Sequence, residues 1–369
     1  SRYIGGDPEL APLHRLGSDQ WKKAQARAKK RAHDAAAELL KTQALRTLRS
    51  GRCYSVPHTE YAAVRSGFPY DETPDQEHAI EEVVADLKAS TPMDRLVCGD
   101  VGFGKTEVAL RAAFVVAQNG YQVAVLTPTT LLAHQHHNTF AERFADYPIR
   151  IEELSRFKSP TASAQLVQDI GGGSVDIVIG THRLLQQDIN FHQLGLVIID
   201  EEHRFGVRQK ERLKQLREEV DVLTLTATPI PRTLNIALSG LRSISLIGSP
   251  PPGRVSIKTT VQRYSTHLIR EACLREMHRG GQVYFLHNEV RTIDRVAADL
   301  RDLIPEASIE VAHGQMPKSD LESVMRDFYH QRFDVLVCST IIESGIDIPT
   351  VSYTHLRAHE TSLHLVCRL

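Results

Sequence analysis

Eight consecutive residues have the composition and spacing of a phosphate-binding loop. Residues 99–106 read Gly-Asp-Val-Gly-Phe-Gly-Lys-Thr and fit the pattern G-x-x-x-x-G-K-[ST]. Glycines let backbone N–H groups turn toward phosphate oxygens, a lysine can reach the outer phosphates, and a threonine hydroxyl can bind Mg²⁺. The predicted nucleotide-binding residues are Gly99, Gly102, Gly104, Lys105 and Thr106. An apolar run before the loop and an alanine-rich stretch after it predict the strand and helix that such a loop requires.

Two further polar groups follow apolar runs of the sequence. Asp200 and Glu201 come directly after four aliphatic residues, at the expected carboxyl end of a buried parallel strand, where ligands bind in open α/β sheets. We predict that Asp200 binds Mg²⁺ through water and that Glu201 orients the attacking water, so that Lys105, Asp200 and Glu201 are the catalytic residues. Thr226 and Thr228 end another apolar run and can connect this site to a neighbouring domain.

An aromatic residue and an amide precede the loop. Phe68 and Gln76 are placed to recognise adenine, because a glutamine pairs with the base through one donor and one acceptor. Taken alone, this stretch also has the composition of a helix N-terminus, with Thr73 as the cap and Pro74 in the first turn. With the loop and the acids, it predicts a site for ATP and Mg²⁺.

Strand-like and helical stretches alternate, which predicts an α/β protein with parallel sheets. The first set of strands is expected near 95–98, 122–127, 175–180, 195–200 and 222–226. A proline cluster at 249–253 predicts a linker. The second set comprises strands near 282–287, 308–312 and 334–339, with helices near 266–279, 290–303 and 318–329. We expect domains at 61–245 and 246–350, a linker with a long helix at 1–60, and a separate tail at 351–369.

The bulk composition excludes several classes of protein. The 369 residues include 44 Lys and Arg against 45 Asp and Glu, so no global basic charge indicates nucleic acid. The five cysteines are scattered, which argues against a disulfide framework and fits a reducing cytoplasm. No apolar run approaches the length of a membrane span, so no membrane partner is expected. The chain begins with Ser1 rather than Met, and we expect it to be part of a longer protein.

The segment 18–49 is strongly basic and has the composition of a helix with a narrow apolar stripe. It is either a solvated helix packed through that stripe, or a helix that contacts nucleic acid or an absent domain. The residues alone leave both interpretations open.

In combination, the motifs resemble those of superfamily 2 helicases and translocases. Besides Gln76 and the loop, they comprise TPTTLLAHQH (127–136), IGTHRLL (179–185), DEEHRFGV (200–207), TATPIPRTL (226–234) and STIIESGIDIP (339–349). Within the superfamily, the resemblance is to the bacterial transcription-repair coupling factors and then to the RecG branch-migration helicases. It implies two RecA-like lobes, the second truncated, and an ATP hydrolase that moves along double-stranded DNA. It also implies displacement of stalled RNA polymerase and recruitment of excision-repair proteins through domains absent here; branch migration is the alternative.

The resemblance also implies roles for individual residues. The nucleic-acid track would comprise Pro128, Thr129, Thr130, Thr181, His182, Arg183, Thr340 and Glu343, which suit phosphate contact without base reading. Gly345 and Asp347 would contact nucleotide where the two lobes meet. His203 and Arg232 would join Thr226 and Thr228 in coupling the sites, although Arg232 could instead contact DNA or support packing.

The resemblance stops near residue 350. The family continues with a Gln-x-x-Gly-Arg-x-Gly-Arg motif, whose arginines stabilise charge on the transferred phosphoryl group. Residues 351–369 contain no Gln or Gly and have the character of an aberrant tail. We therefore expect the chain as written to bind ATP far better than it hydrolyses it. A nucleotide-dependent DNA-binding module with little turnover is the second hypothesis.

Overall fold

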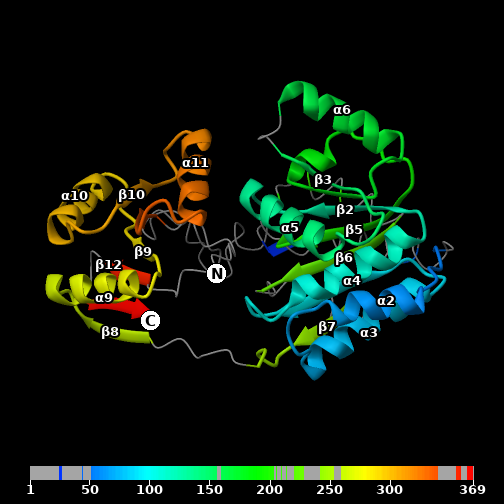
Figure 1. The fold of residues 1–369 in the computed structure, drawn as a ribbon, viewed down its shortest axis with the longest axis horizontal. Helices are drawn as coiled ribbons and strands as arrows, with labels where there is room; N and C mark the ends of the chain where they lie inside the picture. Colours follow the sequence, from blue (N-terminus) through cyan, green and yellow to red (C-terminus); the bar gives the residue numbers. More distant parts are fainter. Residues whose placement is uncertain are drawn as a thin grey trace.

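The computed structural model describes residues 51–155, 159–202, 220–227, 242–252 and 264–339, the backbone of 259–263, 355–358 and 364–368, and a few isolated positions. Two sheets form two lobes that lie side by side (Figure 1). The predicted α/β class with two parallel-sheet lobes is confirmed. The expected basic helix at 18–49 lies outside the described residues, apart from three isolated positions.

The first lobe contains a sheet of seven strands, in which every pairing is parallel. Its strands are β1 (Asp94–Gly99), β2 (Gln122–Leu126), β3 (Ile151–Leu154), β4 (Ile177–Gly180), β5 (Leu194–Asp200), β6 (Asp221–Thr226) and β7 (Ser243–Ile247). Their order is β3-β4-β2-β5-β6-β1-β7. The sequence predicted the five inner strands but missed the edge strands β3 and β7, because polar residues interrupt their apolar pattern. β7 runs slightly past the domain boundary expected after residue 245.

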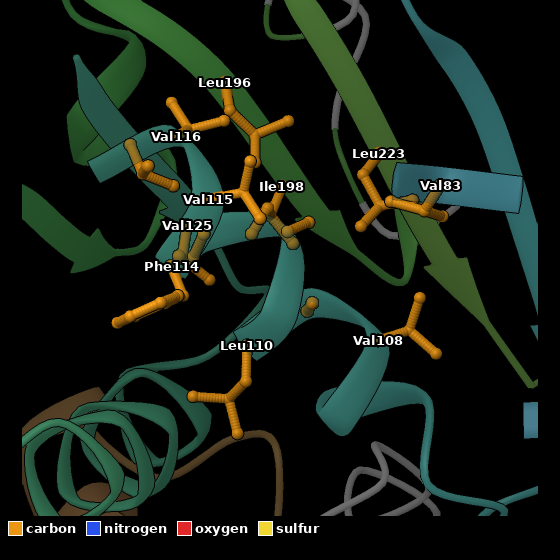
Figure 2. Close-up of a cluster of buried hydrophobic side chains, with 14 of the residues drawn as sticks. Val83, Val108, Leu110, Phe114, Val115, Val116, Val125, Leu196, Ile198 and Leu223 are labelled. Atoms are coloured by element: carbon orange, nitrogen blue, oxygen red, sulfur yellow. The ribbon is translucent and has the colours of Figure 1, made fainter. Parts of the chain in front are cut away.

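Five α-helices of this lobe lie among the described residues. They are α2 (His58–Ser66), α3 (Pro74–Lys88), α4 (Lys105–Gln118), α5 (Thr130–Arg143) and α6 (Pro160–Gly171). Every residue of α4 from Glu107 to Ala117 is buried, because α4 contacts α2 and α3 as well as the sheet. Figure 2 shows its side chains within the core, with Phe114 and Val115 near Val125 and Ile198. This packing holds the helix that follows the phosphate loop.

Side-chain caps mark where three of these helices begin, and two of the three caps lie in the predicted motifs. The Thr73 hydroxyl accepts from the Gln76 backbone N–H, and Pro74 occupies the first turn of α3, as the sequence predicted. Thr129 caps α5 in the same way through the Leu132 N–H. Both helices therefore start at residues that the motifs contain.

The second lobe contains a smaller sheet with the order β10-β11-β9-β12-β13-β8. Its strands are β8 (Thr259–Arg263), β9 (Val283–Leu286), β10 (Ile309–Ala312), β11 (Val335–Cys338), β12 (His355–Ala358) and β13 (His364–Arg368). The helices are α9 (Thr266–His278), α10 (Ile293–Leu303) and α11 (Lys318–Tyr329), close to the predicted ranges. Strands β10, β11, β9 and β12 are parallel, whereas β13 runs antiparallel to both neighbours. Within the described part of the chain, no helix is long and apolar enough to cross a membrane.

Candidate nucleotide and nucleic-acid site

Three neighbouring parallel strands end together at one edge of the first sheet. Strand β6 lies between β1 and β5, with Cys98 of β1 opposite Thr226 and Asp200 of β5 opposite Leu225. The phosphate loop follows β1, so this order brings the loop, Thr226 and Asp200 to the same place. The carboxyl edge of such a sheet is where α/β proteins bind ligands.

The loop has a conformation that its glycines make possible. Gly102 and Gly104 have φ angles of 79° and 76°, in the left-handed region that residues with a Cβ rarely adopt. A Cβ on Gly104 would also collide with the side-chain amide of Gln76. Helix α4 begins at Lys105, directly after Gly104, and its uncapped N-terminal N–H groups are available to an anion.

The Lys105 ammonium folds back over the loop. Its Nζ donates to the carbonyl oxygens of Gly99 and Asp100, at 2.7 and 2.9 Å. Burial lowers the pKa of Lys105, and the nearby carboxylates of Asp200 and Glu201 oppose that effect. The amine is therefore close to both acids and can exchange the two carbonyls for phosphate oxygens.

Glu201 is held by the end of β6. Its two carboxylate oxygens accept from the Thr226 hydroxyl at 3.1 Å and from the Ala227 backbone N–H at 2.9 Å. The backbone of Glu201 has a φ of 51°, an uncommon value for a residue with a side chain. Such strain is often retained at functional positions because it fixes the direction of a side chain.

The donors at this edge fit a magnesium–nucleotide complex. Thr106 lies in the first turn of α4, and Asp200 ends a strand two positions away in the same sheet. Among the described residues, no cluster of three or more His, Cys, Asp or Glu side chains could hold a metal by itself. Mg²⁺ in phosphate sites commonly takes one or two carboxylates and completes its shell with phosphates and water.

Gln76 is buried and already has two partners. Its Oε1 accepts from the Thr73 backbone N–H at 2.8 Å, and its Nε2 donates to the Phe103 carbonyl of the phosphate loop at 2.9 Å. The predicted adenine-reading amide therefore also connects α3 to the loop. Recognition of a base by this side chain requires exchange of at least one of these bonds.

Phe68 is half-buried, and its ring contacts Arg143, a residue that no sequence motif indicated. The Arg143 guanidinium lies 5.6 Å from the ring centroid, and Tyr70 meets the same ring edge-on. Arg143 donates at 2.8 Å to Glu107, which also pairs with Arg111 one turn along α4. Charged residues at i and i+4 inside an otherwise apolar helix were the signal that could have revealed this buried network.

The two segments expected to contact nucleic acid lie at the same sheet edge. Residues 127–130 follow β2 and residues 181–183 follow its neighbour β4, and the Thr127 N–H donates to the Gly180 carbonyl at 2.9 Å. Pro128, Thr129 and Thr130 form the start of α5, and Thr181 precedes the 3₁₀ turn η2 (His182–Leu185). Arg183 donates to the Asp188 carboxylate at 2.6 Å and also to Gln186.

Seven predicted site residues lie outside the described residues: His203, Thr228, Arg232, Thr340, Glu343, Gly345 and Asp347. One described residue close to the acids in space was not predicted. The buried Arg242 pairs with Asp94 at 2.8 Å and with Glu202 at 3.3 Å, and it also contacts Thr224. It ties the residue after Glu201 to the sheet. No motif in the residues around Arg242 indicated this role.

Two protein families match the chain. The DEAD/DEAH box helicase family matches residues 73–236, and the helicase conserved C-terminal domain matches residues 265–358. The first match contains the phosphate loop and the acids, and the second covers the second lobe apart from β8 and β13. The chain is thus similar to both domains of a helicase core.

Several similar proteins are longer than this chain. The transcription-repair-coupling factor of Escherichia coli is 55% identical over 352 residues, which cover 95% of this chain and 31% of that protein. The corresponding factor of Bacillus subtilis is 48% identical over 351 residues, covering 95% and 30%. The chain therefore spans about a third of the length of these relatives.

A solved structure of RecG bound to a three-way DNA junction is also similar. It has 30% sequence identity and a TM-score of 0.69, and the alignment covers 89% of this chain and 45% of RecG. The helicase MrfA bound to DNA shares the fold at 17% identity, with a TM-score of 0.59 over 83% of this chain and 46% of that one.

Proposed function

We propose that this chain is the ATP-driven motor of a double-stranded DNA translocase of superfamily 2, and its similarity to two helicase domain families supports the proposal. One observation carries the proposal: the phosphate loop, the acids and the segments 127–130 and 181–183 lie along one sheet edge. Nucleotide chemistry and nucleic-acid contact can therefore share one rigid platform.

The residues around the loop divide the nucleotide chemistry among them. Lys105 and the N-terminus of α4 bind the phosphates, and Thr106 and Asp200 hold Mg²⁺. When bound, Mg²⁺ neutralises charge on the phosphate oxygens. Glu201, oriented by Thr226 and Ala227, positions the attacking water. Phe68 and Gln76 face the adenine, and Gly345 and Asp347 of the second lobe would complete the nucleotide contacts.

The nucleic-acid contacts are made to the phosphate backbone. Hydroxyls, backbone N–H groups and Arg183 bind phosphate oxygens without reading bases, as a motor that steps along any sequence requires. Thr340 and Glu343 would add contacts from the second lobe, and His203, Thr228 and Arg232 would couple the two sites. We propose domains at 61–245 and 246–350, preceded by a linker and basic helix at 1–60.

The biological role follows from the similarity to the coupling factors. We propose that the full-length cytoplasmic protein displaces stalled RNA polymerase and couples that event to nucleotide excision repair. The partner proteins would bind parts of the protein beyond this chain. The similarity to RecG favours branch migration as a second candidate. If the protein regresses a model replication fork and does not displace a stalled polymerase, branch migration is the better assignment.

The test is the ATP hydrolysis rate of the full-length protein with and without duplex DNA. Duplex DNA should raise turnover severalfold in the wild type. Lys105→Ala should lower turnover by about a hundredfold or more, because a cation facing the transferred phosphoryl group is removed. A wild-type rate that is indifferent to duplex DNA would refute the translocase assignment.

For residues 1–369 alone, we propose nucleotide-dependent DNA binding with little turnover. The proposal is supported by residues 351–369, which do not contain the arginine motif of the family. Equilibrium binding of ATP should be retained while phosphate release stays near background. Rapid ATP hydrolysis by this chain would contradict the importance of that motif.

A further inference from the structure

A histidine outside the predicted catalytic set contacts the metal-binding acid. His136 lies in the middle of α5, and its Nε2 is 3.3 Å from Oδ2 of Asp200. The side chains are only 10% and 15% exposed, so water does little to screen the contact. Because a carboxylate can only accept a hydrogen bond, the imidazole donates through Nε2–H.

The imidazole ring is fixed in place by its surroundings. Phe140, one turn further along α5, is fully buried and meets the His136 ring edge-on, with 6.3 Å between the centroids. His136 itself is buried, so its ring has little room to rotate away from the carboxylate. A donor held in this way restricts the directions in which Asp200 can present its oxygens.

The same helix reaches the nucleic-acid segment and the second lobe. Its N-cap is Thr129, one of the residues proposed to contact nucleic acid. Leu131, in the first turn, packs against the apolar cluster of the second lobe that contains Met325 and Phe328. α5 and α11 are in contact. Figure 1 shows the two helices on the facing sides of the two lobes. From Thr130 to His136 the helix rises only about 9 Å, a distance over which it behaves as a rigid rod.

We propose that His136 is a positioning residue that orients Asp200 for Mg²⁺, and that α5 transmits nucleic-acid binding to the metal site through this contact. A shift of the α5 N-terminus would move Nε2 relative to Oδ2 and change the geometry of the acid. Partners that orient a metal ligand typically contribute about ten- to a hundredfold in metal affinity. The metal assignment and the transmission both rest on the proposed function.

The experiment compares three variants of the full-length protein. His136→Phe keeps an aromatic ring but removes the donor, whereas His136→Gln keeps an N–H near the Nε2 position. His137→Phe is the control, because that ring belongs to the neighbouring, less buried residue and hydrogen-bonds Asn138 instead of Asp200. The readout is the Mg²⁺ concentration that gives half-maximal binding of a fluorescent ATP analogue, without DNA.

We expect His136→Phe to raise that Mg²⁺ concentration by about tenfold, while His136→Gln and His137→Phe stay within about twofold of the wild type. Nucleotide affinity without Mg²⁺ should be unchanged in all three, which separates positioning from a folding defect. If the Phe ring disturbs the packing, His136→Leu replaces it in the same comparison. A Mg²⁺ dependence unchanged in His136→Phe, or equally impaired in His136→Gln, would overturn the positioning role.

A second measurement tests the transmission. Duplex DNA should lower the half-maximal Mg²⁺ concentration of the wild type, and His136→Phe should lose most of that response. A variant that keeps the full response would refute transmission through this contact. If DNA does not change the turnover of the wild type, the translocase proposal is refuted. A raised half-maximal Mg²⁺ concentration in His136→Phe would still support the positioning role in that case. The two failures are therefore distinguishable.

Discussion

At the scale of single residues, side chains proposed to contact ligands already have partners within the protein. Lys105 binds two loop carbonyls, and Gln76 bridges the loop and α3. Arg183 is paired with Asp188, whose pKa is lowered by the hydrogen bonds and charge of that guanidinium. Each ligand therefore replaces an internal contact, so its affinity reflects the difference between two sets of bonds.

The Arg183–Asp188 pair gives a prediction about DNA affinity. Asp188→Asn should strengthen duplex binding by roughly fivefold, because an exposed ion pair that competes with phosphate contributes at most about 1 kcal/mol. Arg183→Ala should weaken binding and reduce the slope of log affinity against log salt by about one. Fluorescence anisotropy over a salt series measures both effects.

The control for that prediction is Asp169→Asn. Asp169 is the ion-pair partner of Arg150 in the same lobe, and its substitution by Asn changes the net charge by the same amount as Asp188→Asn. If Asp169→Asn strengthens binding as much as Asp188→Asn does, the effect is one of overall charge and Arg183 is not a specific phosphate contact.

At the scale of elements, buried charges fix how the helices around the nucleotide site pack. Glu107 is 3% exposed and pairs with Arg111 of α4 and Arg143 of α5. These bonds join the helix after the phosphate loop to the end of α5. Asp75, in the first turn of α3, accepts from the backbone N–H groups of Gly248 and Ser249, directly after β7.

The buried network predicts a large loss of stability. Glu107→Ala should lower the free energy of unfolding by about 3 kcal/mol, because it leaves two buried guanidinium groups without their shared carboxylate. Glu271→Ala is the matched control, since Glu271 forms an exposed i, i+4 pair with Arg275 and should change stability by less than about 0.5 kcal/mol. Urea unfolding followed by circular dichroism measures both, and equal losses would contradict the assignment.

Asp75 predicts how acid affects the segment after β7. Hydrogen bonds from Ser249, first from its hydroxyl and then from its backbone, lower the pKa of Asp75. A carboxyl whose pKa is lowered by folding stabilises the folded state at pH values above its ordinary pKa of about 4. This stabilisation is lost as the pH falls through the pKa of the folded state. The protection of the Gly248 and Ser249 backbone amides against hydrogen–deuterium exchange should therefore decrease in acid.

The matched variant is Asp75→Asn, whose amide does not titrate in this range. It should show weaker protection at neutral pH and no acid-dependent decrease at these two amides. Protection that falls with acid in the same way in Asp75→Asn would assign the effect to another group.

At the scale of the whole molecule, the two lobes meet through α5 and α11. Leu131 of the first lobe packs against the cluster of Tyr284, Met325 and Phe328 in the second. Two rigid sheets with a small contact between them can change their relative position when a ligand binds both. We propose that closure of the lobes is the conformational step that couples ATP binding to movement along DNA.

This contact predicts how the lobes cooperate. Leu131→Ser should reduce the DNA stimulation of ATP hydrolysis severalfold, because a leucine side chain contributes about 1–2 kcal/mol when it packs. ATP binding should remain unchanged. Leu246→Ser is the control, since Leu246 is 66% exposed on β7 of the first lobe. Equal effects of the two substitutions would show that the packing of Leu131 on the second lobe is unimportant.

The sequence alone identified the five inner strands of the first sheet, the three helices of the second lobe and the phosphate loop. Strand and helix boundaries depend on the periodicity of a few neighbouring residues, and the cap at Thr73 depends on the residues of one helical turn. The loop is defined by eight consecutive residues whose glycine and lysine types have a direct chemical reason. Short edge strands were missed because β3 reads Ile-Glu-Glu-Leu, which has no local apolar pattern.

The tertiary structure alone decided which of these parts meet. The order in which β6 separates β1 from β5 depends on how all seven strands pair, and no local pattern encodes it. The contacts of His136 with Asp200 and of Arg143 with Glu107 join residues far apart in the chain. Such contacts exist only after helices pack on the sheet, because side-chain direction and burial are then determined by many residues at once.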